Sequence, residues 1–364
     1  MKQRIVILGS YGEFTRRVAA GLVAMPAVDV VLGLPPAAQA TSFAGRIGVP
    51  FMVIDPNDPS ALQRLLQGAF AVVNLRGPFA TRDHLATATR CAALGVHYVD
   101  PSDSREYLGE FTKLARDARE HEALLVTGAG AAPAVTAVLA GLLIGEFERA
   151  SEIHVFVTPG LDDQRELAIA RSILDRTEDP LRIKKRGRWQ EEHWWTRPEM
   201  VRFPPPVGRR RGWLCDLPDL ELMVRQFDVG TVTARAGFAP GLLSFVIALL
   251  AAQRRAGSVR HLSPMTARLV RLAARLSRAH GEAGAIRVAV RGLSRRHIEE
   301  EHVVYLVARA GTGPAIAAAP ILALVRKWVE HGVPETGALP CVGMLSLDDI
   351  RPELADHNIV LIRE

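Results

Sequence analysis

The expected fold of the N-terminal part of this chain follows from the sequence Ile5-Val6-Ile7-Leu8-Gly9-Ser10-Tyr11-Gly12-Glu13-Phe14-Thr15. It reads as a short apolar strand, a turn that contains two glycines, and the start of a helix that continues to Met25. A second apolar run, Val28 to Leu32, follows, so that strand, helix and strand occupy about 30 residues, the length of a βαβ unit. The opening therefore predicts two neighbouring parallel strands.

The same alternation continues through the first 150 residues. Further strands are predicted at 51–54, 71–75, 96–99 and 123–126, and helices at 59–67, 81–94 and 104–122. Short apolar strands separated by helices are typical of a parallel sheet that is covered on both faces. The predicted fold class is α/β, with an N-terminal Rossmann-type doubly wound parallel sheet and a second α+β domain with a mixed sheet. We expect domains at 1–150 and 151–335, with a C-terminal segment, 336–364, that returns to the first domain.

Composition and cysteine usage exclude several classes of protein. The 364 residues are 48% hydrophobic and 23% charged, which excludes a disordered tail and suits two domains with their own cores. Cys91, Cys215 and Cys341 are odd in number and far apart, so neither a disulfide framework nor a CxxC metal site is expected. The HExxH, GxSxG, P-loop and EF-hand patterns are all absent. We therefore predict no metal site and a reducing, cytoplasmic location.

The apolar segments are too short for a membrane protein. The first strand is shorter than a signal-peptide core, and the longest apolar runs, 134–144 and 238–252, are shorter than the roughly 18 residues that span a bilayer. We predict no integral membrane segment.

In parallel sheets ligands bind beyond the carboxyl ends of the strands, and the first such end carries the glycine turn. Gly9 permits a tight turn, and Gly12 would let a phosphate approach the N–H groups at the positive end of the following helix. The usual GxGxxG is absent, because Tyr11 and Phe14 stand at the second and third glycine positions. A plain βα turn is the alternative, but the flanking strands and helix favour nucleotide binding.

The end of the second strand normally discriminates between the two nicotinamide cofactors. Here it reads Leu32-Gly33-Leu34-Pro35-Pro36, with neither an acidic residue for a ribose hydroxyl nor an arginine for a phosphate. Asp29 comes too early and Arg46 is the nearest later cation. The choice between NAD and NADP therefore stays open.

Three later segments resemble the successive strand-end motifs of the saccharopine dehydrogenase-like oxidoreductases. They are Val72-Val73-Asn74-Leu75-Arg76-Gly77-Pro78-Phe79, Gly95-Val96-His97-Tyr98-Val99-Asp100 and Thr127-Gly128-Ala129-Gly130-Ala131-Ala132-Pro133. The turn Gly9 to Phe14 is similar to the family's variant fingerprint. The resemblance covers roughly residues 4–140, and a weaker likeness continues at 337–343 and 345–354.

The resemblance implies an NAD(P)-dependent oxidoreductase that transfers a hydride to or from a C–N or C–O bond of a small substrate. It implies a second domain that shapes the substrate site and mediates homodimer formation. The expected cofactor contacts are Gly9, Ser10, Tyr11, Gly12, Glu13, Phe14, Asp55, Gly77, Pro78, Phe79 and Gly128, and the expected catalytic residues are Tyr98 and Asp100. The chain departs from the family at Thr15, where relatives commonly have Gly or Ala, and at Leu34, near a common cofactor-binding Arg.

The residues support this assignment in part. Strand alternation places Tyr98 and Asp100 on one face, where Asp100 could accept a proton or hold a substrate ammonium. Its alternative role is to cap the turn at Pro101 and Ser102. Two interpretations of Gly128 to Gly130 remain: their backbone N–H groups bind an anion, or the glycines allow two backbone segments to pack closely as they cross.

The second half contains two basic segments. Residues 184–195 interleave basic and aromatic side chains, which can bind single-stranded nucleic acid. Because Glu191 and Glu192 interrupt this run, we favour a solvated hairpin and expect no nucleic-acid partner.

The formal net charge of +6 comes mainly from residues 251–300, which hold 11 basic and 3 acidic side chains. Within them, the arginines of residues 268–278 are spaced as on one helix face, which we expect to pair with acids. Peripheral membrane contact is the alternative for this helix. The alternative function is therefore a catalytically silent Rossmann-fold dimeric binding or membrane-surface module.

Overall fold

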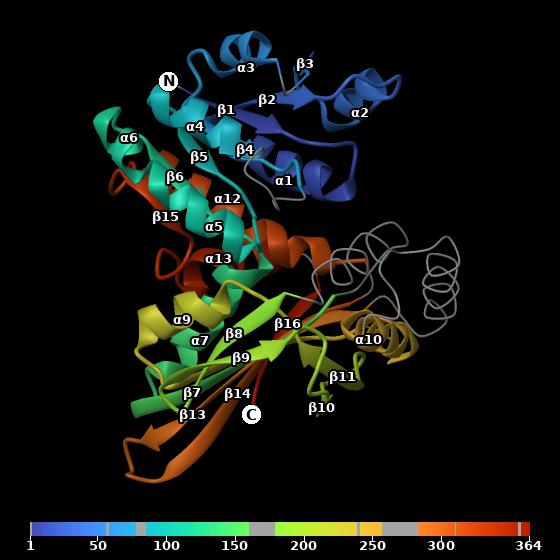
Figure 1. The fold of residues 1–364 in the computed structure, drawn as a ribbon. Coiled ribbons are helices and arrows are strands. Elements are labelled where there is room, and N and C mark those ends of the chain that lie inside the picture. Colours follow the sequence, from blue (N-terminus) through green and yellow to red (C-terminus); the bar gives the residue numbers. More distant parts are fainter. Residues whose placement is uncertain are drawn as a thin grey trace. The chain divides into compact units, whose positions relative to one another are not determined.

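A computed structural model gives the structure of the chain (Figure 1). It describes residues 2–55, 58–77, 85–159, 179–238, 241–256, 283–309, 311–355 and 358–364. The contacts divide the chain into two compact units, Met1–Val135 with Pro314–Leu354, and Thr136–Gly313 with Ala355–Glu364. The described residues do not include the basic helix expected at 268–278, nor Pro78 and Phe79.

The first unit contains a seven-stranded sheet in which every pairing is parallel. From one edge to the other, its strands are β15 (Gly337–Pro340), β6 (Leu124–Thr127), β5 (His97–Val99), β4 (Ala71–Asn74), β1 (Gln3–Leu8), β2 (Val28–Leu34) and β3 (Phe51–Val53). The short runs of β-branched and leucine side chains in β1, β4 and β6 are buried. This confirms the predicted doubly wound parallel sheet.

Helices connect and cover these strands (Figure 1). They are α1 (Glu13–Val23), α2 (Ala40–Ile47), α3 (Pro59–Leu66), α4 (Leu85–Ala93), α5 (Arg105–Phe111), α6 (Ala115–Glu120), α12 (Gly313–His331) and α13 (Leu347–Ala355). The packing is close enough that a Cβ on Gly21 of α1 would lie 2.6 Å from a methyl carbon of Leu322 in α12. Residues 314–354 thus complete the core of the first unit.

One predicted helix is wrong in its continuity. The single helix expected over 104–122 is divided into α5, a 3₁₀ turn at Thr112–Leu114, and α6. The Thr112 hydroxyl donates a hydrogen bond to the Gly109 carbonyl over 3.0 Å. Such back-bonding from a threonine bends a helix, because it competes with the backbone hydrogen-bond ladder.

The second unit contains a mixed sheet, as predicted. Its main path is β10 (Glu199–Arg202), β11 (Arg209–Leu214), β12 (Thr231–Ala236), β7 (Phe147–Thr158), β13 (Gly284–Ser294), β14 (Glu299–Ala308) and β16 (Ile359–Arg363). β7 is parallel to β12 and antiparallel to β13. Its helices are α7 (Thr136–Ile144), α9 (Asp219–Phe227) and α10 (Gly241–Arg255).

The basic and aromatic segment forms the expected hairpin. β8 (Pro180–Lys185) pairs antiparallel with β9 (Arg188–His193). The connecting residues Arg186 and Gly187 both have positive φ, 50° and 78°, which suits a two-residue hairpin turn. Trp194 and Trp195 are buried. These two tryptophans therefore contribute to the core, whereas Trp189 in β9 is exposed.

None of the helices in the described ranges is both long and apolar enough to cross a membrane.

Candidate functional site

The glycine turn after β1 is shaped by the side chain of Thr15. The Ser10 N–H donates to Thr15 Oγ1 over 3.2 Å, and the Gly9 N–H donates to the Gly33 carbonyl over 3.1 Å. Thr15 is buried beneath the turn, and a Cβ added to Gly9 would lie 2.5 Å from Thr15 Cγ2. Gly9 is therefore required by close packing, and Thr15 takes part in forming the turn.

Gly12 lies directly before α1 and leaves its N-terminus open. It has extended backbone angles, provides no side-chain cap, and is exposed. A Cβ placed on Gly12 would meet only Ser10 Oγ, at 3.6 Å. The first N–H groups of an α-helix have no partner within the helix and carry a partial positive charge. The uncapped end and the open space in front of it fit a phosphate group of a dinucleotide.

Glu13 and Phe14 occupy the first turn of α1. The Glu13 carboxylate accepts hydrogen bonds from Arg16 over 2.6 Å and from Arg17 over 3.3 Å. The hydrogen bond from Arg16 is the main reason that the pKa of Glu13 is lowered. The two arginines thus compensate the negative charge that Glu13 brings to this helix end. Phe14 is half-buried.

Tyr11 connects the glycine turn with the end of β2. Its hydroxyl donates to the carbonyl of Pro35, and its ring packs edge-to-face on Phe43, with centroids 5.6 Å apart. The Arg46 guanidinium lies 5.9 Å from the Phe43 ring centroid. Other dinucleotide-binding domains carry the residue that discriminates between NAD and NADP after the second strand. In this chain, Tyr11, Phe43 and Arg46 are the side chains near that strand end.

Two further predicted contacts lie at neighbouring strand ends. Asp55 follows β3 and is exposed, next to Ile54, whose N–H donates to the Leu34 carbonyl over 2.9 Å. Gly77 follows β4, is exposed, and donates its N–H to the Leu75 carbonyl over 3.1 Å. The β4 end borders the glycine turn, since the Leu75 N–H donates to the Leu8 carbonyl over 2.7 Å.

Asp100 is the centre of a buried polar network at the ends of β5 and β6. Its Oδ1 accepts hydrogen bonds from the Thr127 hydroxyl over 2.7 Å and the Ser102 N–H over 2.9 Å. Its Oδ2 accepts a hydrogen bond from the Tyr107 hydroxyl over 3.0 Å. The residue has no exposed surface. The hydrogen bond to Ser102 is the turn cap considered from the sequence, and the carboxylate also links β6 and α5.

The network continues to β4 through tyrosine hydroxyls. The hydroxyls of Tyr107 and Tyr98 lie 3.3 Å apart, and the Asn74 amide donates to the Tyr98 hydroxyl over 2.9 Å. Because Tyr107 donates its proton to Asp100, Tyr98 is the donor between the two tyrosines. The structure therefore brings the predicted pair, Tyr98 and Asp100, together through Tyr107.

Burial controls the protonation of this network. It raises the pKa of Asp100 from 3.8 to about 6, against hydrogen bonds from Ser102, Thr127 and the tyrosines that lower it. Burial also raises the pKa of Tyr98 well above its ordinary value. A carboxyl with a pKa of about 6 can hold or release a proton near neutral pH.

The loop after β6 is close-packed. Gly128 has a φ of 78°, and a Cβ there would lie 2.8 Å from Pro133 Cδ. The N–H groups of Gly128, Ala129 and Gly130 donate to Asp100 Oδ1, the Asp100 carbonyl and the Gly128 carbonyl over 3.4, 2.8 and 2.8 Å. The glycine crossing is therefore observed directly, and these three N–H groups donate within the protein.

Sequence reasoning missed four members of this edge. They are Asn74, Arg76, Tyr107 and Thr127. Asn74 and Thr127 each end an apolar strand with a buried polar side chain, and this signal could have identified them. Tyr107 carries no such signal, because only the tertiary fold brings α5 to the end of β5.

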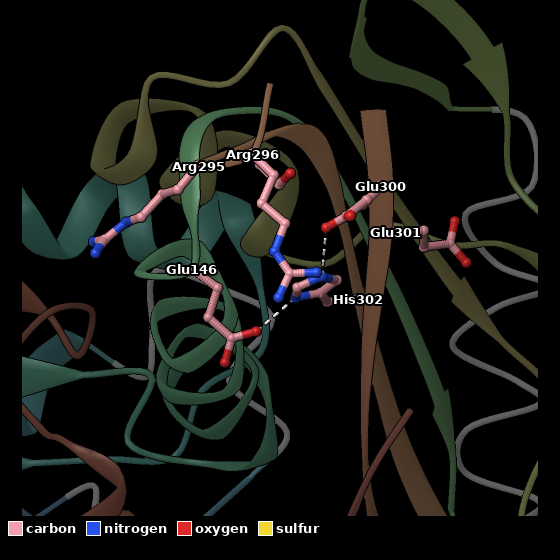
Figure 2. Close-up of a pocket in the computed structure, with 7 residues that line it drawn as sticks. Glu146, Arg295, Arg296, Glu300, Glu301 and His302 are labelled. Carbon is pink, nitrogen blue, oxygen red and sulfur yellow. Dashed lines mark hydrogen bonds and ion pairs between the residues drawn. The ribbon is translucent and has the colours of Figure 1, made fainter. Parts of the chain in front are cut away.

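The second unit contains a polar hollow of about 540 Å³ (Figure 2). His302 lies between Glu146, at 2.5 Å from Nδ1, and Glu300, at 3.3 Å from Nε2. Arg287 and Arg291 pair with Glu301. No group of three or more metal-ligating side chains converges within the described residues. Since its carboxylates are paired, the hollow is a weaker candidate than the edge of the first sheet.

Residues 5–132 match the family model described as the saccharopine dehydrogenase NADP binding domain. No curated protein sequence matches the chain. The structure is similar to saccharopine dehydrogenase (L-Glu forming) from Saccharomyces cerevisiae, with a TM-score of 0.73 and 15% identity over 100% of this chain and 99% of that chain. At this identity the likeness shows a shared fold.

Two other solved structures have lower similarity. A meso-dapdh mutant from Clostridium tetani has a TM-score of 0.49 and 12% identity, over 97% of this chain and 100% of that chain. A myo-inositol dehydrogenase from Corynebacterium glutamicum has a TM-score of 0.45 and 11% identity, over 91% and 90%. Residues 5–132 therefore match the saccharopine dehydrogenase NADP-binding domain, and the whole chain shares its fold with the yeast enzyme.

Proposed function

We propose that the chain is an NAD(P)-dependent oxidoreductase that transfers a hydride to or from a C–N or C–O bond of a small substrate. The observation that carries the proposal is the open N-terminus of α1 behind Gly12, at the carboxyl edge of a parallel sheet. Its helix N–H groups offer hydrogen bonds to a phosphate, and the family match supports a nicotinamide dinucleotide as the source of that phosphate.

The cofactor supplies the hydride chemistry, and the protein supplies position and electrostatics. In this proposal Gly9 and Thr15 set the turn, and Gly12 admits the phosphates. Gly77, after the end of β4, borders the cofactor, while Asp55 borders it from the end of β3. The network around Asp100 and Tyr98 holds a proton and positions the substrate. Few reactive side chains are needed, because no protein nucleophile takes part.

The end of β2 favours acceptance of NADP as well as NAD. No acidic residue stands between Asp29 and Asp55, so no carboxylate after β2 is available to bind the ribose hydroxyls or to repel a phosphate on the ribose. Arg46, beside Phe43, is the next cation along the chain. We therefore propose that NADP binds at least as strongly as NAD.

The second unit is proposed to shape the substrate site and to form a homodimer in the cytoplasm. Its mixed sheet ends at β16, beyond which no strand of the described residues pairs. Light scattering of the purified full chain measures the assembly directly. A mass of two chains supports the homodimer, and a mass of one chain at high concentration contradicts it.

The proposed activity is tested first at the level of binding. The purified chain is titrated with NADH and with NADPH while the nicotinamide fluorescence is followed. A saturable response to either supports the proposal. The absence of a response to both contradicts it.

A further inference from the structure

Arg76 is a half-buried cation at the end of β4 that is held by neutral oxygens. Its Nη2 donates to Thr87 Oγ1 over 2.7 Å, and its Nε donates to Asn74 Oδ1 over 3.3 Å. Within the part of the chain that the structure describes, no carboxylate forms an ion pair with it. Burial lowers the pKa of Arg76, and Asp55 opposes this only through space.

This arrangement differs from that of an ordinary structural arginine. A buried charge is costly unless it is paired, and structural arginines usually lie against a carboxylate. Asn74 and Thr87 orient the guanidinium without neutralising it, and both are themselves buried, with 1% and 2% of their surface exposed. Asn74 is fixed in turn by its hydrogen bond to Tyr98. The positive charge is therefore retained and its direction is fixed.

The position of Arg76 indicates what the charge is for. It follows Leu75, whose N–H bonds the last residue of β1, so it lies beside the glycine turn at the edge where ligands of parallel sheets bind. A guanidinium presents several N–H groups in a plane that matches the paired oxygens of a carboxylate or phosphate. We propose that Arg76 is the oxyanion anchor of this site.

The inference rests on the proposed function and adds to it the chemistry of one ligand group. Two sources can supply the oxyanion, namely the pyrophosphate of the cofactor and a carboxylate of the substrate. The two sources make different predictions for simple probes, because inorganic pyrophosphate imitates the first and malonate imitates the second.

The test uses the full chain and four variants. Arg76→Met removes the charge, Arg76→Lys keeps the charge but not the planar fork, and Thr87→Val keeps the arginine but removes one of its two anchors. Arg64→Met is the matched control, because Arg64 is an exposed arginine in the last turn of α3. Circular dichroism and urea unfolding establish that each variant is folded. If Arg76→Met fails to fold, the binding of the probes is compared in Arg76→Lys and Thr87→Val instead.

Calorimetry measures the dissociation constants for inorganic pyrophosphate, for NADPH, and for malonate in the presence of NADPH. Loss of a charge-assisted hydrogen bond weakens binding by about 10-fold or more. If Arg76→Met raises the dissociation constants for pyrophosphate and NADPH by this factor, the oxyanion belongs to the cofactor. If it weakens only malonate, the oxyanion is the substrate's carboxylate. In both cases Arg64→Met binds as the wild type does, and Arg76→Lys and Thr87→Val show smaller losses.

Unchanged binding of all three probes by the Arg76 variants overturns the inference, even if NADPH binds normally and the proposed function holds. Conversely, pyrophosphate binding that depends on Arg76, in a chain that binds neither NADH nor NADPH, supports the anchor and contradicts the proposed function. A wild-type chain that binds none of the probes contradicts both.

Discussion

The hydroxyl of Tyr107 donates a hydrogen bond to Asp100 Oδ2 over 3.0 Å, with both side chains buried. Asp100 follows β5, and Tyr107 lies in α5, where the Ser104 side chain caps the helix by accepting the Tyr107 N–H. The contact therefore ties the first turn of α5 to the end of β5. With Thr127 on the opposite oxygen, it joins the end of β5, α5 and β6 around one carboxylate.

Asp100→Asn is expected to destabilise the chain. The carboxylate accepts hydrogen bonds from Tyr107, Thr127 and Ser102, and an amide nitrogen cannot accept one. At least one buried donor then loses its partner, which costs about 1 to 3 kcal/mol. Urea unfolding followed by circular dichroism measures the loss. The control is Asp29→Asn at the exposed position of β2, whose free energy of unfolding should stay within about 0.5 kcal/mol of the wild type. Equal stabilities of the two variants would show that the network contributes nothing.

The contribution of Asp100 to the free energy of unfolding should decrease as pH rises. Its pKa in the folded chain is about 6, above the ordinary value of 3.8. Between these values the folded state binds more protons than the unfolded state, so the free energy of unfolding falls as pH rises from about 4 to about 6 and then levels off.

Subtracting the free energy of unfolding of Asp100→Asn from that of the wild type isolates this contribution from other groups. The difference should be more favourable to the wild type at about pH 4.5 than at about pH 7.5. A difference that increases with pH would mean that hydrogen bonds outweigh burial and that the folded pKa is lowered.

Gly9→Ala should disturb the turn through Thr15. The new methyl would lie 2.5 Å from Thr15 Cγ2, and overpacking of this kind costs roughly 1 to 3 kcal/mol. In a Thr15→Ala background the two closest atoms are gone and the nearest remaining contact is Thr15 Cβ at 3.2 Å. Gly9→Ala should therefore cost less there. Urea unfolding measures the loss in free energy of unfolding that Gly9→Ala causes in each background. Equal losses would show that contact with Thr15 is not what requires glycine at position 9.

Gly12→Ala should separate binding from stability. An alanine can adopt the backbone angles of −88° and 165° found at this position, and its methyl would meet only Ser10 Oγ at 3.6 Å. The free energy of unfolding should change by less than about 0.5 kcal/mol. The methyl fills the space before α1, so the dissociation constant for NADPH should rise about 10-fold or more. An unchanged dissociation constant would place the phosphates elsewhere.

Much of the first unit could be predicted from the sequence because its strands are local apolar runs with glycine or polar residues at their ends. The order of β1 to β6 along the chain, the glycine turn, and the shared face of Tyr98 and Asp100 all followed from this pattern. The pairing of β15 with β6 could not follow, since Gly337 and Leu124 are brought together only by the tertiary fold.

The contacts within the site were less predictable than its location. The partners of Asp100 come from three elements, and Thr15 interacts with the turn through packing that residue spacing does not encode. The break at Thr112 depends on one side-chain hydrogen bond that competes with the helix ladder. Local patterns identify the strand ends, whereas the geometry of the polar groups depends on how helices cover the sheet.

Hydrogen–deuterium exchange of the full chain, with and without NADPH, tests the central claim most directly. The claim is that the backbone N–H groups of the glycine turn and of the first turn of α1 bind the phosphates of the cofactor. Saturating NADPH is expected to slow exchange in residues 10–16 of the wild type and to have a smaller effect in Gly12→Ala. Saturable NADPH binding that leaves exchange in these residues unchanged would contradict it.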